Sequence, residues 1–310
     1  MSANVPFSTG FTPLSPEGPR PDWLKVRVGS TGDVEATRRR LQSLGLNTVC
    51  VSASCPNLCH CWRRGHATIL ILGPECSRHC RFCHVSKKAP VPPDPDEPRR
   101  VAEAVRAGGL DEVVVTSVTR DDLPDGGAAH WAAVVRAIRA AAPAARIEVL
   151  VPDFQGKDAA LATVFASKPD IFGHNLETVP RLYPAVRPEA DYARSLAVLR
   201  AAASAGFIVK TSLMLGLGET DDEIRRALLD AHDAGASIVY LGQYLRPTPL
   251  HTPVRGYLSP AHFAALGEEA RRIGFATVRS APLVRSSLPD APPEGTDLDL
   301  PTQPRTTNHV

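Results

Sequence analysis

The chain has 310 residues, of which 43% are hydrophobic and 22% are charged, and its formal net charge is +2. This composition is typical of a protein that folds around a core, and so small a charge gives no reason to expect nucleic acid or an anionic membrane as a partner. No apolar run approaches the ~20 residues that span a bilayer. Residues 1–10 lack the basic and apolar parts of a secretory signal, so we expect a cytoplasmic protein.

Both ends of the chain are rich in proline. Residues 1–22 contain five prolines and show no apolar period, and residues 289–310 contain five more among polar residues. Such segments do not bury enough apolar surface to fold. We therefore predict a flexible arm over 1–22 and a disordered tail over 289–310. An N-terminal extension over 23–65, with a helix from about Asp33 to Leu44, is expected to precede one α/β domain over 66–288.

Strand-like and helix-like segments alternate along residues 66–288. The apolar, β-branched runs that predict strands are Thr68–Leu72, Glu112–Ser117, Arg146–Val151, Asp170–Phe172, Phe207–Leu213 and Ser237–Tyr244. The segments that predict helices are 97–107, 128–141, 157–166, 189–205, 220–234 and 260–273. Continuous apolar strands joined through helices are typical of a parallel sheet buried on both faces. We therefore predict a partial (β/α)6 barrel with N- and C-terminal extensions, whose chemistry lies at the C-terminal ends of the strands.

All seven cysteines lie within residues 50–83. A disulfide framework would spread its cysteines along the chain and would normally contain an even number of them. Buried structural cysteines do not cluster at ligand spacing either. The cluster of cysteines therefore indicates metal binding.

The second group of cysteines is Cys76, Cys80 and Cys83, in a C-x3-C-x2-C spacing directly after the first predicted barrel strand. Three thiolates on one loop can hold three irons of a four-iron cluster and leave the fourth iron open. The alternative is a zinc knuckle, although structural zinc sites usually take four ligands as two paired hooks.

This motif, with Phe82 just before its last cysteine, resembles that of the radical S-adenosylmethionine (SAM) superfamily. The resemblance implies a barrel of the radical SAM type. It also implies that the open iron binds the amino and carboxylate groups of SAM and delivers the electron that releases a 5′-deoxyadenosyl radical. Residues expected near SAM are Phe82, Thr116, Asn175 and Arg187.

The first group contains Cys50, Cys55 and Cys61, in a C-x4-C-x5-C spacing. With the Cys-Pro-Asn and Cys-Trp pieces, it resembles the lipoyl synthase family. Further segments that match that family are Thr116–Gly127, Glu148–Gly156, His174–Arg181, Lys210–Thr220, Gly242–Thr248 and Pro282–Ser287. The resemblance covers roughly residues 22–288.

The family resemblance implies a second, auxiliary [4Fe-4S] cluster held by Cys50, Cys55 and Cys61. Its remaining ligand is the serine of the C-terminal Arg-Ser-Ser element, here Ser287, with Ser286 as the alternative. The implied reaction inserts two sulfur atoms from that cluster into an octanoyl chain on a lysine of a carrier domain. One deoxyadenosyl radical abstracts hydrogen at each carbon. The implied partners are the octanoylated lipoyl-carrier domain, an electron donor such as flavodoxin or ferredoxin, and an Fe–S carrier.

Around the first cysteine group the chain departs from the family pattern, at Val51, Ser52 and His60. Two alternatives therefore stay open: a divergent radical SAM paralogue that sulfurates another substrate, and a non-catalytic zinc-binding module. Cys59 is an additional thiol that could be a substitute cluster ligand, a sulfur-handling thiol or an inert neighbour. We favour the inert role because Cys59 is poorly placed, so close to Cys61 in sequence, to share the same cluster.

Other polar residues have simpler interpretations beside functional ones. His174 and Asn175 end a predicted strand and either contact SAM or substrate or form a hydrogen-bonded pair at the rim. Arg246 is a second candidate, beside Arg187, for the SAM carboxylate.

Asp121, Asp122 and Asp125 favour a turn with a helix cap over a metal site. The Gly216-Leu-Gly218 turn is weak evidence for phosphate binding and more consistent with close approach of a cofactor to the backbone.

Overall fold

The structure is a computed structural model that describes residues 20–25, 32–63 and 65–288. Eight strands form one sheet in the order in which they occur along the chain. They are β1 (Asn47–Thr48), β2 (Ile69–Ile71), β3 (Glu112–Ser117), β4 (Arg146–Leu150), β5 (Ile171–Gly173), β6 (Ile208–Leu215), β7 (Ile238–Gln243) and β8 (Thr277–Ser280). β1 pairs with β2 antiparallel, and every later pair is parallel. β1 and β8 are the two edges, so the barrel is open.

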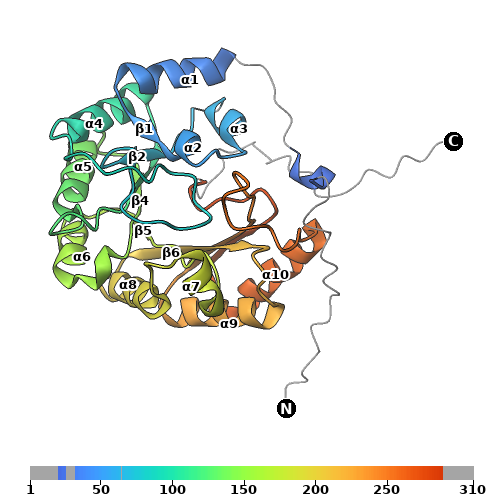
Figure 1. The fold of residues 1–310 in the computed structure, drawn as a ribbon. Helices are drawn as coiled ribbons and strands as arrows, with labels where there is room; N and C mark the ends of the chain where they lie inside the picture. The colour runs from blue at the N-terminus through green and yellow to red at the C-terminus, as the bar shows by residue number, and fades with distance from the viewer. Residues whose placement is uncertain (1–19, 26–31, 64, 289–310) are drawn as a thin grey trace.

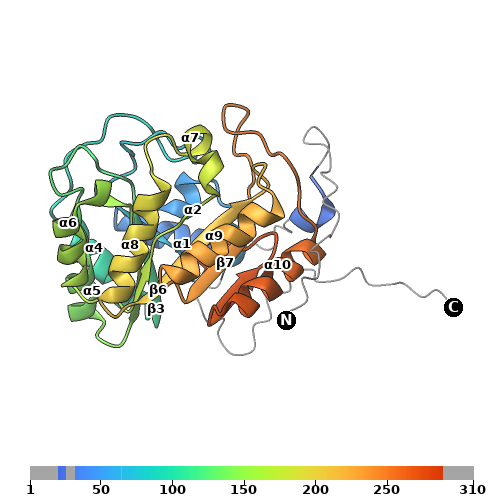
Figure 2. The same cartoon turned by 90° about the horizontal axis from the view of Figure 1, so that it is seen from below.

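The helices cover the outside of this curved sheet (Figure 1). They are α1 (Gly32–Ser43), α2 (Val49–Ser52), α3 (Leu58–Trp62), α4 (Glu97–Gly108), α5 (Ala128–Ala141), α6 (Asp158–Phe165), α7 (Tyr183–Val186), α8 (Tyr192–Ser204), α9 (Asp221–Asp233) and α10 (Pro260–Ile273). Figure 2 shows α8, α9 and α10 side by side outside the sheet, with α7 among the loops at one end of the strands. The short helices α2 and α3 lie near β1, at the first edge of the sheet.

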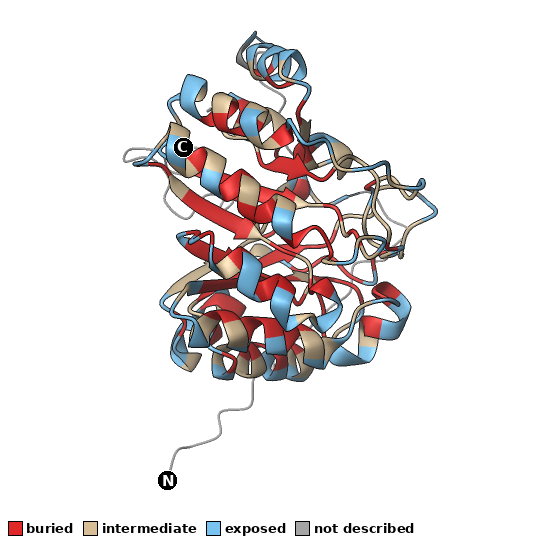
Figure 3. Ribbon diagram, turned by 90° about the vertical axis from the view of Figure 1, so that its left-hand side faces the viewer, coloured by how far each residue is buried: buried red, intermediate tan, exposed pale blue. Residues whose placement is uncertain are grey.

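Local sequence explains why these elements form. α9 begins with a capping box, in which the Thr220 side chain accepts from the Glu223 backbone N–H and Glu223 accepts from the Thr220 backbone N–H. α10 begins with Ser259 as its N-cap and Pro260 in its first turn. The strands between the two edges are largely buried on both faces, whereas the long helices bury one face and expose the other (Figure 3). Removal of this apolar surface from water holds the barrel together.

The predicted fold class is confirmed. All six predicted strands and all seven predicted helices are present, with ends that differ by a few residues. β1, β8 and the short helices α2, α3 and α7 were not predicted from the sequence. β1 has only two residues, and each residue of β8 is half-buried, so neither segment shows an apolar run.

Some predictions fall on residues outside the described ranges. The predicted arm does so apart from 20–22, and the predicted tail does so entirely. The proposed division into arm, extension, barrel and tail remains a prediction. In the described part of the chain no helix is long and apolar enough to cross a membrane.

Candidate active site

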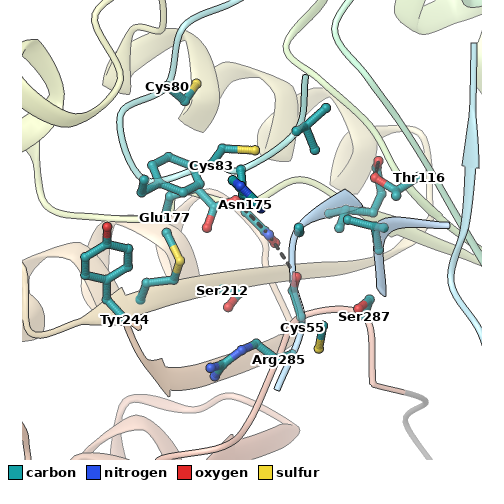
Figure 4. Close-up of a pocket in the computed structure, with 18 of the residues that line it drawn as sticks. Cys55, Cys80, Cys83, Thr116, Asn175, Glu177, Ser212, Tyr244, Arg285 and Ser287 are labelled. Atoms are coloured by element: carbon teal, nitrogen blue, oxygen red, sulfur yellow. Dashed lines mark hydrogen bonds between the residues drawn. The ribbon is translucent and has the colours of Figure 1, made fainter. Parts of the chain in front are cut away.

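A cavity of about 490 Å³ lies at the C-terminal ends of the parallel strands. It is lined by Cys76, Cys80 and Cys83 of the second cysteine group, by Cys50 and Cys55 of the first, and by residues 284–287 near the end of the described chain. Figure 4 shows Cys80 and Cys83 on one side of this cavity, and Cys55, Ser287 and Arg285 on the other. The fold therefore brings both cysteine groups and the C-terminal Arg-Ser-Ser element to one space.

The loop that carries Cys76, Cys80 and Cys83 is clamped to the ends of β3 and β4 by Arg78. This arginine is 3% exposed and forms ion pairs with Asp121 at 2.6 Å and with Asp153 at 2.5 Å. Burial opposes ionisation of Asp153, but hydrogen bonds and charge from Arg78 outweigh it and hold the pKa of Asp153 below its ordinary value. The backbone N–H of Thr119 also donates to Cys76 Sγ at 3.3 Å. The loop is thus fixed before anything binds to it.

The thiols in the cavity are poor acids by themselves. Burial raises the pKa of Cys80 to about 11 and also raises the pKa of Cys83 and of Cys55. All seven cysteines are free rather than paired in disulfides. A buried thiol gives up its proton when a metal takes its place, because the metal supplies the positive charge that the surroundings lack. These thiols lie together in enclosed cavities and are not in disulfides, so they are suitable ligands for iron–sulfur clusters.

The first cysteine group surrounds a second, smaller cavity. Cys50, Cys55 and Cys61 all line it, together with Ser287. α2 supplies Cys50 and α3 supplies Cys61. Cys59 is not among the residues that line either cavity. Its interpretation as an inert neighbour agrees with this position.

The C-terminal segment is held across the sheet by side chains from three distant parts of the chain. Asn57 Nδ2 donates to the Leu283 carbonyl at 2.7 Å, Thr68 Oγ1 donates to the Ser287 carbonyl at 3.4 Å, and Lys210 Nζ donates to the Leu288 carbonyl at 3.3 Å. Lys210 is itself buried in an ion pair with Glu148 at 2.8 Å. These contacts place Ser287 beside the first cysteine group.

Gly242 of β7 gives this segment the space it needs. A Cβ atom at position 242 would lie 2.1 Å from the Val284 carbonyl oxygen, a backbone atom that cannot turn away. The close approach of residue 284 to β7 therefore depends on the missing side chain.

The two serines of the segment have different surroundings. Ser286 Oγ accepts a hydrogen bond from Asn175 Nδ2 at 3.0 Å and lines only the larger cavity. Ser287 lines both cavities. Of the two, Ser287 is the one that shares a cavity with all three cysteines of the first group.

Arg285 brings a positive charge to the boundary of the two cavities. It lines both, and its guanidinium donates to the Val284 carbonyl at 2.6 Å. Burial lowers its pKa, and within the described ranges it forms no ion pair with a carboxylate. Since an enclosed charge is costly without a counter-charge, this position suits an anionic group such as a thiolate-bound cluster.

His174 presents an unused hydrogen-bond acceptor in the larger cavity, which it lines. Its Nδ1 lies 2.9 Å from the Val151 carbonyl, which only accepts, so the proton is on Nδ1. Nε2 is buried and has no protein partner. Burial, with a contribution from the charge of Arg187, lowers the pKa of His174 to about 4, so the ring is neutral. Asn175 Oδ1 is a second buried acceptor without a protein partner.

Arg187 and Arg246 both line the cavity but differ in their bonding. The Nη1 of Arg187 donates to the Leu176 carbonyl at 2.9 Å and to the Tyr183 hydroxyl at 3.0 Å, while its buried Nε has no protein partner. Arg246 Nε donates to the His251 carbonyl at 2.8 Å, and its Nη2 donates to the Pro249 carbonyl. Arg246 therefore braces its own loop, and Arg187 keeps a donor for a bound molecule.

The remaining candidates from the sequence also reach the larger cavity. Phe82 lines it and packs against the hydrophobic cluster that contains Tyr244. Thr116 lines it too, and its hydroxyl donates to the Leu150 carbonyl at 2.9 Å across the β3–β4 pair.

The predicted turn with a helix cap before α5 is confirmed at Asp125, and the Gly216–Gly218 turn is stabilised from within the chain. The Gly216–Gly218 turn is closed by the chain itself, because the Glu219 carboxylate accepts from the backbone N–H groups of Gly216 and Leu217. Of the three aspartates near the start of α5, only Asp125 caps the helix, accepting from Ala129 N–H at 2.8 Å. The other two are paired with arginines: Asp121 with Arg78 and Asp122 with Arg120.

Three features of the site were not predicted from the sequence: Glu177, Asp153 and the charge that Arg285 brings to the cavities. Glu177 lines the cavity, and burial raises its pKa. It follows His174 and Asn175 after β5, so its place at a strand end was the available signal. Among the described residues, no group of three or more His, Cys, Asp or Glu side chains is placed so that it could hold a single metal ion.

The fold is an open barrel of parallel strands, and the loop that follows β2 carries three thiols. This combination is typical of one class of enzyme. The family model described as the radical SAM superfamily matches residues 70–231, just over half of the chain. A crystal structure of Streptococcus suis SuiB bound to S-adenosylmethionine has the same fold, with a TM-score of 0.54 and 11% identity over 69% of this chain and 50% of that one. The chain is a radical SAM enzyme, and it uses SAM and [4Fe-4S] clusters.

Curated relatives define the family more narrowly. The lipoyl synthase of Chlorobium phaeovibrioides is 50% identical over 270 residues, which cover 86% of this chain and 95% of the relative. That of Nitratidesulfovibrio vulgaris is 52% identical over 267 residues, which cover 86% of this chain and 90% of the relative. The chain belongs to the lipoyl synthase family.

Proposed function

We propose that this enzyme inserts two sulfur atoms into a protein-bound octanoyl chain and so forms the lipoyl cofactor. The observation that supports this proposal is that the two cysteine groups and Ser287 line two cavities that have Cys50, Cys55, Arg285 and Ser287 in common. An enzyme that only cleaved SAM would need a single cysteine group, not two.

The two groups have separate roles in this proposal. Cys76, Cys80 and Cys83 would hold the cluster that binds SAM, and Cys50, Cys55, Cys61 and Ser287 would hold the auxiliary cluster. When bound, these groups supply the electron that cleaves SAM to a 5′-deoxyadenosyl radical and the sulfur that the substrate receives. Arg78 keeps the radical loop in place, and Arg285 offsets negative charge at the auxiliary site.

Ser287 is the serine that we assign to the auxiliary cluster. It lines the cavity formed by Cys50, Cys55 and Cys61, whereas the Ser286 hydroxyl is engaged by Asn175. Serine oxygen binds iron more weakly than thiolate does. A weak ligand suits a cluster that is dismantled when it gives up sulfur.

Polar side chains at the strand ends are placed to orient SAM. Arg187 offers a buried donor for the SAM carboxylate, and Asn175 and His174 offer buried acceptors for amino or hydroxyl groups. Thr116 and Phe82 complete this side of the cavity. Apolar walls that include Leu70, Leu150 and Leu213 suit the octanoyl chain and exclude water from the radical.

The reaction implies partners. The substrate is an octanoylated lipoyl-carrier domain. Reductive cleavage of SAM needs an electron donor such as flavodoxin or ferredoxin, and a consumed auxiliary cluster needs an Fe–S carrier to rebuild it. Seven free thiols favour a reducing compartment, which we take to be the cytoplasm.

The two alternatives, a paralogue that sulfurates another substrate and a zinc-binding module, are not favoured, because the relatives are about half identical over most of the chain.

The direct test is the triple variant Cys50→Ala, Cys55→Ala, Cys61→Ala, assayed on an octanoyl-lysine peptide. We expect SAM cleavage to continue while the lipoyl product disappears. Loss of SAM cleavage as well would contradict the division of roles, and an unchanged yield of product would exclude the auxiliary site as the sulfur source.

A further inference from the structure

Two loops meet beside the larger cavity, one over residues 81–93, which begins within the last part of the radical loop, and one over residues 244–258 between β7 and α10. We call them the rim loops. The Thr252 backbone N–H donates to the Arg81 carbonyl at 2.8 Å, and the rings of His84 and His251 stack edge to face at 5.5 Å. Both loops supply cavity-lining residues, among them His84 and Leu245. Both loops therefore border the cavity.

All the formally charged side chains of the rim loops are positive. Within these bounds the loops carry five cations and no aspartate or glutamate: Arg81, Lys87, Lys88, Arg246 and Arg255. Asp94 and Asp96, which follow the first loop directly, form ion pairs with Arg100 and Arg99 of α4. None of the five cations of the rim loops forms an ion pair with a described residue. Elsewhere on the surface, arginines such as Arg99, Arg139 and Arg181 are paired with carboxylates. The whole chain has a net charge of only +2, so this concentration beside the cavity is local.

The rim loops also expose apolar side chains. Leu250 is 96% exposed and Val91 is 58% exposed, and they are two of only four large hydrophobic side chains that are exposed in the described ranges. Val91 lies between Pro90 and Pro92, and Leu250 directly follows Pro249. Proline restricts the backbone, so little entropy is lost when such a loop binds a partner. An apolar anchor within a rim of like charges is typical of a protein–protein contact.

We propose that the rim loops dock the protein carrier of the acyl chain, through an acidic face of the carrier and an apolar contact with Leu250. This inference rests on the proposed function, which requires a protein-bound substrate whose acyl-lysine reaches into the cavity while its domain stays outside. Unpaired cations beside the cavity attract an acidic domain and orient its acyl-lysine toward that cavity.

The test compares a protein substrate with a peptide substrate. The variant Lys88→Glu, Arg255→Glu reverses two rim charges whose side chains do not line the cavity. The substrates are an octanoylated lipoyl-carrier domain of acidic net charge and an octanoyl-lysine peptide with neutral flanks. We expect kcat/KM on the carrier to fall by about tenfold or more, since steering by complementary charge has effects of this size. The value on the peptide and the iron content stay unchanged.

Matched variants sharpen the result. Arg200→Glu reverses an exposed cation on α8, away from the rim, and leaves both substrates unaffected. Leu250→Ser lowers turnover of the carrier but not of the peptide. In the unaltered enzyme, salt slows turnover of the carrier, whereas in the charge-reversed variant this dependence is weaker.

Other outcomes overturn the proposal. If the charge-reversed variant turns over the carrier as well as the unaltered enzyme does, the rim loops do not dock it. An equal loss on carrier and peptide means that the change damaged the active site. Loss of binding to duplex DNA or to anionic vesicles, with carrier turnover unchanged, assigns the surface to another partner. Failure of the unaltered enzyme on both substrates would contradict the proposed function itself, which the docking test alone does not address.

Discussion

Arg187 and Arg246 show how hydrogen bonding separates two arginines that the sequence presents as equals. Both line the cavity, yet Arg246 is bonded to carbonyls of its own loop, and Arg187 retains a buried Nε without a protein partner. We expect Arg187→Gln to weaken SAM binding by roughly 10- to 100-fold, the worth of a charge-assisted hydrogen bond of about 1.5–3 kcal/mol.

The measurement is the dissociation constant of SAM in the anaerobic enzyme. Arg246→Gln is the matched control, because it removes the same charge from the same cavity and leaves SAM affinity within about threefold. Equal losses in the two variants would contradict the assignment of Arg187.

His174 makes stability depend on pH with a definite sign. Burial lowers its pKa to about 4 in the folded protein, from an ordinary value of 6.5. Between these values the unfolded chain binds the proton and the folded chain does not, so stability falls as the pH falls from 6.5 toward 4. The full effect is about 3 kcal/mol, since each pKa unit corresponds to about 1.4 kcal/mol.

Urea unfolding of the unaltered protein and of His174→Gln at several pH values measures this contribution. At pH 7 the variant is less stable, because it loses the bond to the Val151 carbonyl and some packing. We expect the gap to narrow as the pH is lowered to 5, because glutamine does not titrate. A gap that stays constant across this range would mean that His174 protonates freely in the fold.

At the scale of elements, Gly242 links β7 to the C-terminal segment. A Cβ at this position would collide with the Val284 carbonyl oxygen. We expect Gly242→Ala to cost about 1–3 kcal/mol, the range for overpacking. It also displaces the segment that carries Ser287, so the protein loses auxiliary iron and keeps the radical cluster.

The control is Gly32→Ala at the start of α1, where an added Cβ meets no atom within 4 Å. Iron content and unfolding midpoints are compared for the two variants. Retention of the full iron content by Gly242→Ala would show that the auxiliary site does not need the segment in this position.

The elements also show what the sequence reveals and what it conceals. Strands β3 to β7 were predictable because a strand buried on both faces is a continuous apolar run. The half-buried edge strand β8, with the sequence Thr-Val-Arg-Ser, has no such pattern. The cysteine motif was recognisable because its ligands lie on one short loop. The bond from Asn57 to the Leu283 carbonyl joins residues 226 positions apart, and no local pattern predicts it.

For the molecule as a whole, the sheet order explains why two distant sequence motifs share one cavity. The strands follow the chain order from β1 to β8, so the segment after β8 begins at the far edge from the first cysteine group. Residues 281–288 then cross back, held by Asn57, Thr68 and Lys210. Two cysteine groups near the start of the barrel and a serine after its last strand are thereby brought together, an arrangement that the sequence suggested only through its family resemblance.

The central claim is that one chain holds two four-iron clusters, one at each cysteine group. Iron and acid-labile sulfide per chain, measured after anaerobic reconstitution, test it most directly. We predict about eight of each for the unaltered protein and about four for the variant that lacks Cys50, Cys55 and Cys61. About four of each in the unaltered protein would contradict the account, because the auxiliary site would then be empty and the proposed source of sulfur absent.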